Sequence, residues 1–148
     1  GGEAPPPAEH LEVRRAVTAA DVAVFERTLI DAYPVPECAD QPPGSLLGPG
    51  IAEDPGWVLL TGFLDDRPVA TAAVRTGPSI GAIEFVSTSE ATRGKGVGAA
   101  MTWAAGKAAG GLPVALIASD LGRPVYERLG YRTLLRFTLW VVPRTEPS

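Results

Sequence analysis

The sequence predicts a single α/β (α+β) domain, built on a mixed and mostly antiparallel sheet of six to seven strands that is flanked by helices. Three strand-like runs follow one another across residues 57–89, joined by the turn segments "DDR" and "GPS". A helical stretch at 97–109 then leads into "LPVALIAS", a continuous apolar run that is typical of a buried strand reached by a crossover. The sequence shows no internal repeat, and its 148 residues fit one domain.

One strand and one helix are predicted ahead of these elements. "LEVRRAV" (11–17) forms the first strand, and Thr18 begins a helix in which Asp21 completes a capping box. The apolar side chains of this helix recur at helical spacing, at Val22, Phe25, Leu29 and Ile30.

The next segment, residues 31–56, is rich in proline and glycine and is predicted to be irregular, with a short helix around 45–53. It contains five acidic residues and neither lysine nor arginine; the acids are Asp31, Glu37, Asp40, Glu53 and Asp54. If the segment forms one wall of a binding site, it would attract a cationic ligand. Ordinary solvated loop charge is the alternative.

At the C-terminal end, "PVYERL" (124–129) is predicted to be a short helix that Gly130 stops. "YRTLLRFTLWVV" (131–142) is then expected to close the sheet as one long strand or a bent pair. The domain is expected to span 11–142. Residues 1–10 are expected to be a disordered tail or a linker remnant, and 143–148 a C-terminal tail.

Composition excludes several classes of function. The chain is 45% hydrophobic and 20% charged with a net charge of −4, which predicts a globular protein without a nucleic-acid partner. Its lone cysteine, Cys38, excludes an internal disulfide and a cysteine-rich zinc site, so we expect no metal and a reducing, cytoplasmic setting. Lys107, Gly110-Gly111 and Pro113 interrupt the apolar stretch 97–119, and no membrane span or signal peptide is expected.

The segment "RGKGVG" (93–98) joins the last of the three strand-like runs to the following helix. Its glycines leave backbone N–H groups unobstructed at the positive end of that helix, where a phosphate is the natural ligand. Arg93 and Lys95 add full charges, so a diphosphate fits better than a lone carboxylate. A tight turn whose glycines serve only packing is the alternative.

A dinucleotide site is a second alternative for these glycines. Gly94-x-Gly96-x-x-Ala99 matches the dinucleotide fingerprint, and Asp120 follows where a ribose-binding acid would lie. However, that fingerprint normally opens a parallel sheet, whereas here it follows antiparallel hairpins. A nicotinamide-cofactor protein is therefore the weaker interpretation.

Two motifs in order favour a different cofactor. "RGKGVG" obeys Arg-x-x-Gly-x-Gly, and "ASDLGRPVYERLGYR" (118–132) carries a short helix with a tyrosine ahead of Gly-aromatic. On these motifs and the order of its elements, the chain resembles the GNAT superfamily of N-acetyltransferases over nearly all of 11–142. The resemblance implies a sheet splayed at its two central strands and an acetyl-CoA-dependent transfer to a primary amine within a ternary complex. A non-catalytic acyl-CoA-binding sensor or structural module is the alternative.

The resemblance also implies how coenzyme A would bind. Its pyrophosphate would lie on the backbone amides of 94–99, and its pantetheine would pair with a strand edge freed by a bulge near Val86, whose amide would meet the thioester carbonyl. Ser119 stands where many members have asparagine. The implied cofactor-binding residues are Val86, Ser87, Thr88, Arg93, Gly94, Lys95, Gly96, Val97, Gly98, Ala99 and Ser119.

The catalytic candidates are Tyr126 and Glu84. Tyr126 stands where the family places its general acid, and a tyrosine pKa of about 10 suits protonation of a departing thiolate. Glu84 is the candidate base, with Asp120 as a second; strand alternation would place Glu84 on the face opposite Ile83 and Phe85. The acceptor is expected to be a small-molecule or peptide amine, and the resemblance leaves a homodimer open.

Overall fold

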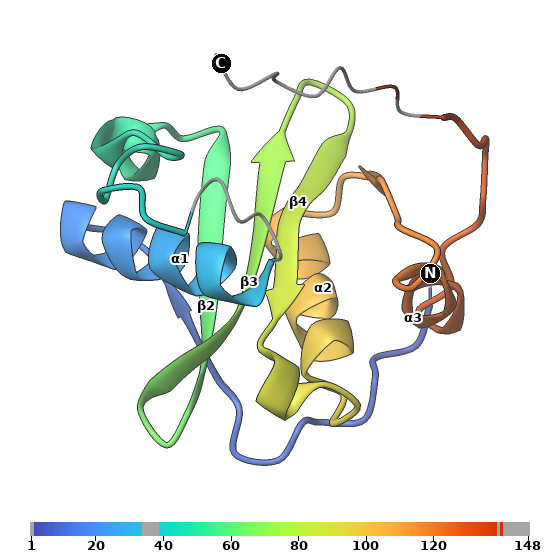
Figure 1. Cartoon of the computed structure of the whole chain (residues 1–148). Coiled ribbons are helices and arrows are strands. Elements are labelled where there is room, and N and C mark those ends of the chain that lie inside the picture. The colour runs from blue at the N-terminus through green and yellow to red at the C-terminus, as the bar shows by residue number, and fades with distance from the viewer. Residues whose placement is uncertain (1, 34–38, 139, 141–148) are drawn as a thin grey trace, which may run out of the picture.

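A five-stranded sheet organises the computed structural model, which describes residues 2–33, 39–138 and 140 (Figure 1). Glu37, one of the five acids of the 31–56 segment, and the lone Cys38 lie outside the described residues. The elements in chain order are β1 (Glu12–Arg15), α1 (Ala19–Ala32), the 3₁₀ helix η2 (Pro49–Glu53), β2 (Trp57–Leu64), β3 (Arg67–Thr76), β4 (Gly81–Thr88), the 3₁₀ helix η3 (Glu90–Thr92), α2 (Val97–Ala108), β5 (Val114–Leu116) and α3 (Arg123–Arg128).

The strands lie side by side in sequence order, β1-β2-β3-β4-β5. The first three pairings are antiparallel and the last, β4 with β5, is parallel because α2 crosses over between them. This confirms the mixed, mostly antiparallel sheet that the sequence predicted.

The two long helices cover opposite faces of the sheet. Ala72 of β3 belongs to the core beneath α2, whereas its neighbour Ala73 belongs to the core beneath α1. Both methyl groups are fully buried. Because alanine projects little from the strand, a helix can approach closely on either side of β3.

The start of α1 is fixed locally, as the sequence predicted. The Thr18 hydroxyl accepts the Asp21 N–H at 3.1 Å, and the Asp21 carboxylate accepts the Thr18 N–H at 2.8 Å. This reciprocal pair confirms the capping box and satisfies two of the N–H groups that a helix start leaves open.

The prediction of a C-terminal strand at 131–142 is wrong for the residues that the structure describes. Residues 131–138 and 140 form no strand, and the rest of 131–142 lies outside the described part of the chain. Leu134 and Trp140 are each 88% exposed. The neighbouring strand β5 has only three residues, so it offers few backbone groups for another strand to pair with. An apolar run favours a strand only where it gains such a partner.

The N-terminal residues were expected to be a disordered tail. Residues 2–10 are irregular except for a turn, yet Ala8 packs against the α2-side core and Leu11 donates its N–H to the Ala8 carbonyl at 3.2 Å. Within the described residues, no helix is long and apolar enough to cross a membrane. The same residues contain no cluster of acidic, histidine or cysteine side chains that could hold a metal ion.

Candidate active site

A β-bulge interrupts β4 at the centre of the sheet. Phe85 and Val86 together oppose the single residue Ala72 of β3, and Phe85 has a positive φ of 55°. The buried Thr71 hydroxyl donates to the Phe85 carbonyl at 2.6 Å and lies 2.7 Å from the Ser87 hydroxyl. Because Thr71 has one proton to give, Ser87 is the donor in that second contact. Side-chain hydrogen bonds therefore hold the extra residue in place.

The bulge reverses which residues of β4 face each helix. Before it, Ile83 packs into the α2-side core; after it, Val86 does so, while Phe85 packs into the α1-side core. The expectation that Ile83 and Phe85 share one face is therefore wrong, because the extra residue shifts the alternation. Glu84 pairs with Ala73 and lies on the α1 face together with Phe85.

The same region is where β4 and β5 part. Their parallel ladder ends at the pair Ile83 and Leu116, although β4 continues to Thr88. Beyond Ile83, the outer edge of β4 has no strand beside it among the residues described. The predicted splay of the sheet is confirmed, and its bulge lies where the resemblance implied.

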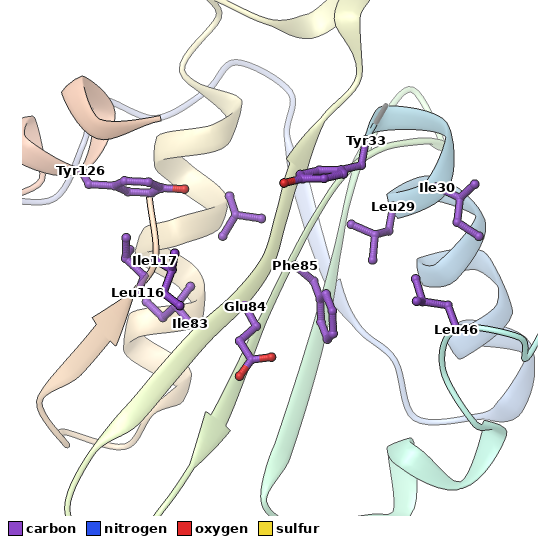
Figure 2. A pocket seen from close by; sticks show the side chains of 11 residues that line it. Leu29, Ile30, Tyr33, Leu46, Ile83, Glu84, Phe85, Leu116, Ile117 and Tyr126 are labelled. Atoms are coloured by element: carbon purple, nitrogen blue, oxygen red, sulfur yellow. The ribbon is translucent and has the colours of Figure 1, made fainter. Parts of the chain in front are cut away.

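A hollow of about 380 Å³ lies over the bulge (Figure 2). We call it the larger hollow. The Tyr33 and Tyr126 hydroxyls point toward one another across it, and the Glu84 side chain lies between its two walls. The lining residues are Leu29, Ile30, Tyr33, Leu46, Ile83, Glu84, Phe85, Val86, Leu116, Ile117 and Tyr126.

A smaller hollow of about 140 Å³ adjoins the first. Its walls come from the end of β4, the first turns of α2 and the α3 region, with Val86, Ser87, Thr88, Gly98, Thr102, Gly122, Val125 and Tyr126 as lining residues. Val86 and Tyr126 line both hollows. The two cavities therefore meet between the bulge and the tyrosine of α3.

The glycine-rich turn leads from β4 into α2. Gly94 and Gly96 have positive φ values of 77° and 78°, and a Cβ at either position would meet nothing within 4 Å. Backbone conformation rather than crowding thus requires glycine here. Gly96 is the N-cap of α2 and forms no side-chain cap, which leaves the N–H groups of Val97, Gly98 and Ala99 open. These are among the amides that the resemblance assigned to a pyrophosphate.

The Arg93 side chain forms hydrogen bonds within the protein. Its guanidinium donates to the carbonyls of Thr88 at 3.2 Å and Ala32 at 3.3 Å. It therefore ties the start of the glycine turn to the end of β4 and the last residue of α1, a structural contact that the motif did not indicate. Lys95, the other cation of the motif, is exposed.

Tyr126 is the titratable side chain at the junction of the hollows. Burial, with a smaller contribution from Tyr33, raises its pKa above the usual value of about 10. Its ring meets the edge of Tyr131, with centroids 6.0 Å apart. A Cβ on Gly122 would come within 3.1 Å of the Tyr126 ring, so glycine there makes room for it. Ser119 shapes the same turn, because its hydroxyl accepts the Gly122 N–H at 3.2 Å.

Glu26 supports one wall of the larger hollow from behind, a role that the sequence analysis missed. It lies on α1, is only 2% exposed, and its carboxylate accepts backbone N–H groups of Gly44, Leu46 and Leu47 at 3.1–3.3 Å. These bonds hold the 44–47 loop against α1, with Leu46 in the wall of the larger hollow. The sequence did contain a signal for this role, because Glu26 falls between Val22 and Leu29 on the apolar face of the helix, where a buried carboxylate needs hydrogen-bond partners.

The acidic segment contributes Tyr33 and Leu46 to the larger hollow, but its described acids lie elsewhere. Asp31 forms an ion pair with Arg27, and Asp54 accepts the Gly56 N–H at 2.8 Å. None of the four described acids of the segment lines the larger hollow. The second candidate base, Asp120, is exposed in a turn and lines neither hollow.

Comparison with known proteins agrees with this architecture. Comparison with curated protein sequences gives no match. Among solved structures, an acetyltransferase from Trypanosoma brucei is 23% identical, with a TM-score of 0.70 over 89% of this chain and 99% of that one. AAC(6')-Iy, solved with the bisubstrate analogue CoA-S-monomethyl-acetylneamine, is 14% identical, with a TM-score of 0.72 over 91% and 99%.

A third similar structure is a predicted acetyltransferase with acetyl-CoA from Clostridium acetobutylicum, 21% identical with a TM-score of 0.65 over 88% of this chain and 96% of that one. The family model described as the acetyltransferase (GNAT) family matches residues 23–131, which include most of α1, the bulge, the glycine turn and Tyr126. The chain therefore belongs to the GNAT family of acetyltransferases.

Proposed function

We propose that the chain transfers an acetyl group from acetyl-CoA directly to a primary amine, with both bound at once. The observation that carries this proposal is the meeting of two hollows at Val86 and Tyr126. A ternary complex needs a site for each substrate and one point where they touch. The smaller hollow, which borders the glycine turn, would take the cofactor, and the larger one would take the amine.

The residues around the smaller hollow fit coenzyme A. The open amides at the start of α2 suit a pyrophosphate, and the unpaired edge of β4 suits an amide-containing chain such as pantetheine. The residues that would hold it are Val86 to Thr88 on β4 and 94–99 in the turn, with Ser119 near α3. Bound acetyl-CoA supplies an activated acyl group. That a similar fold was solved with acetyl-CoA, and another with a CoA bisubstrate analogue, supports this assignment.

The chain's own groups would then supply the proton chemistry. The Tyr126 hydroxyl, kept protonated by its raised pKa, would donate a proton to the departing sulfur. The Glu84 carboxylate, which lines the larger hollow, would accept the proton that the amine loses, directly or through water. The Val86 amide at the bulge would donate to the carbonyl oxygen as negative charge develops on it.

Thermal stability with two ligands tests the cofactor assignment. At a concentration a hundredfold above its dissociation constant, acetyl-CoA should stabilise the protein by about 2.7 kcal/mol, whereas NAD should not. An equal or larger shift with NAD would overturn the proposal. A panel of amines with acetyl-CoA, followed by release of free thiol, tests turnover. Stabilisation by acetyl-CoA without thiol release from any amine would instead indicate an acyl-CoA-binding sensor.

A further inference from the structure

The larger hollow is lined mostly by apolar side chains and contains a single charged group. One wall consists of Leu29, Ile30 and Leu46, and the other of Leu116 and Ile117. The remaining polar groups are the two tyrosine hydroxyls and the Glu84 carboxylate, the only acid among the described lining residues. A ligand that fills this space meets mostly apolar surface and can form one ion pair.

Three aromatic rings add to this surface. Phe85 forms part of the floor, and it is held by an edge contact with Phe25 at 6.4 Å and a stacked contact with Trp57 at 6.0 Å between centroids. The rings of Tyr33 and Tyr126 close the hollow from opposite sides (Figure 2). Aromatic surface of this kind favours a flat, apolar ligand group over a long polar one.

The charges near the hollow argue against a ligand with several amines. A second ammonium group would lie against leucine and isoleucine side chains and would gain no further carboxylate from the described lining residues. Among the described residues, the two acids of α1 nearest its C-terminal end bind other partners, because Asp31 pairs with Arg27 and Glu26 binds the 44–47 loop. The volume of about 380 Å³ also matches small-molecule sites.

We infer that the acceptor is a primary amine with a single positive charge and an apolar body, either aromatic or branched alkyl. This inference rests on the proposed acetyl transfer. The ammonium group lies toward Glu84, and the apolar body packs between the α1 wall and the Leu116–Ile117 wall. The acidic segment contributes to this selection through Tyr33 and Leu46, whereas none of its described acids lines the hollow.

Calorimetric binding to the CoA-saturated protein tests the ligand class without needing turnover. Phenethylamine, ethanolamine and spermidine serve as probes. A phenyl group that buries about 100 Å² should make phenethylamine bind roughly 50-fold more tightly than ethanolamine. Spermidine should bind no better than ethanolamine.

A matched pair of variants locates the selectivity. Ile117 lines the hollow and is 78% exposed, whereas Leu121 is 93% exposed and lines neither hollow, so an aspartate should be tolerated at both positions. Ile117→Asp should lower the ratio of phenethylamine to spermidine affinity at least tenfold. Leu121→Asp should leave that ratio unchanged.

The outcomes separate this inference from the proposed function. Tighter binding of spermidine, equal binding of all three amines, or an equal change in both variants would overturn the acceptor class. Turnover on spermidine alone would do the same while leaving acetyl transfer in place. Selective binding of phenethylamine with no turnover of any amine would support the site's ligand class and contradict the proposed reaction.

Discussion

The two hollows that meet at Tyr126 are built in different ways. The smaller one draws on two continuous stretches, 86–102 and 122–126, and its lining includes the glycines Gly98 and Gly122. The larger one gathers side chains from α1, the 44–47 loop, β4, β5 and α3. Only β4 and α3 contribute to both.

This difference separates affinity for a common cofactor from selectivity for an acceptor. Backbone amides and a strand edge bind a ligand without demands on most side chains, so their requirement appears in the sequence as positioned glycines. Selectivity comes from side-chain shape and charge, which change freely within one fold. The following variants test whether the two hollows are independent in this way.

The largest effect is expected at the junction. Tyr126→Phe removes one hydroxyl and keeps the ring, so kcat and kcat/KM should both fall by roughly 10²–10⁴ while CoA affinity is retained. Tyr131→Phe is the matched control, because its ring packs on Tyr126 but lines neither hollow. Steady-state kinetics and melting temperatures of both variants provide the measurement. A kcat within about threefold of wild type would end the general-acid assignment.

The pH dependence of the wild type sharpens the same test. Because burial raises the Tyr126 pKa, the alkaline fall in kcat should lie above pH 10, the usual tyrosine value being about 10, and should vanish in Tyr126→Phe. The stability of the folded protein should fall over the same alkaline pH range. The protonated phenol is favoured in the native state, so its contribution to stability is present below about pH 10 and is lost as the pH rises toward the native pKa. An alkaline limb that persists in Tyr126→Phe belongs to another group.

A smaller effect, confined to the cofactor side, is expected for Gly96→Val. Valine resists the φ of 78° found there, so we expect a loss of about 1–2 kcal/mol in stability and at least a tenfold loss in CoA affinity. Gly110→Val is the control, because Gly110 has a φ of 68° just beyond the opposite end of α2. It should lose similar stability and no CoA affinity. Equal CoA binding by both variants would mean that the glycine turn serves folding alone.

The smallest change in turnover, confined to the acceptor side, is expected for Glu26→Gln. One amide oxygen cannot accept all the N–H groups that the carboxylate binds, so the free energy of unfolding should fall by about 1–3 kcal/mol. The loosened 44–47 loop should raise the amine KM several-fold, with CoA affinity unchanged. Asp31→Asn, which breaks the exposed pair with Arg27 on the same helix, should leave both quantities nearly unaltered. A parallel loss of CoA affinity in Glu26→Gln would show that the hollows are coupled.

The sequence by itself determined the features that depend on neighbours close in the chain. The capping box of Thr18 and Asp21, the hairpin turn at Asp65 and Asp66 and the glycine turn before α2 rest on hydrogen bonds or backbone angles within a few residues. Such features leave a local pattern, because the residue types that satisfy them are few. The family motif added Tyr126, which the structure brings to the junction of the hollows.

Tertiary structure decided what depends on distant partners. The face occupied by Phe85 follows from a bulge held by Thr71, fourteen residues earlier. The use of Glu26 follows from a loop eighteen to twenty-one residues later. Residues 131–138 have the composition of a strand but gain no strand partner in the described chain, and the last strand of the sheet, β5, has only three residues. Such contacts form only where the gain in hydrogen bonding and burial exceeds the entropy of bringing distant segments together, and no local pattern of residues records that balance.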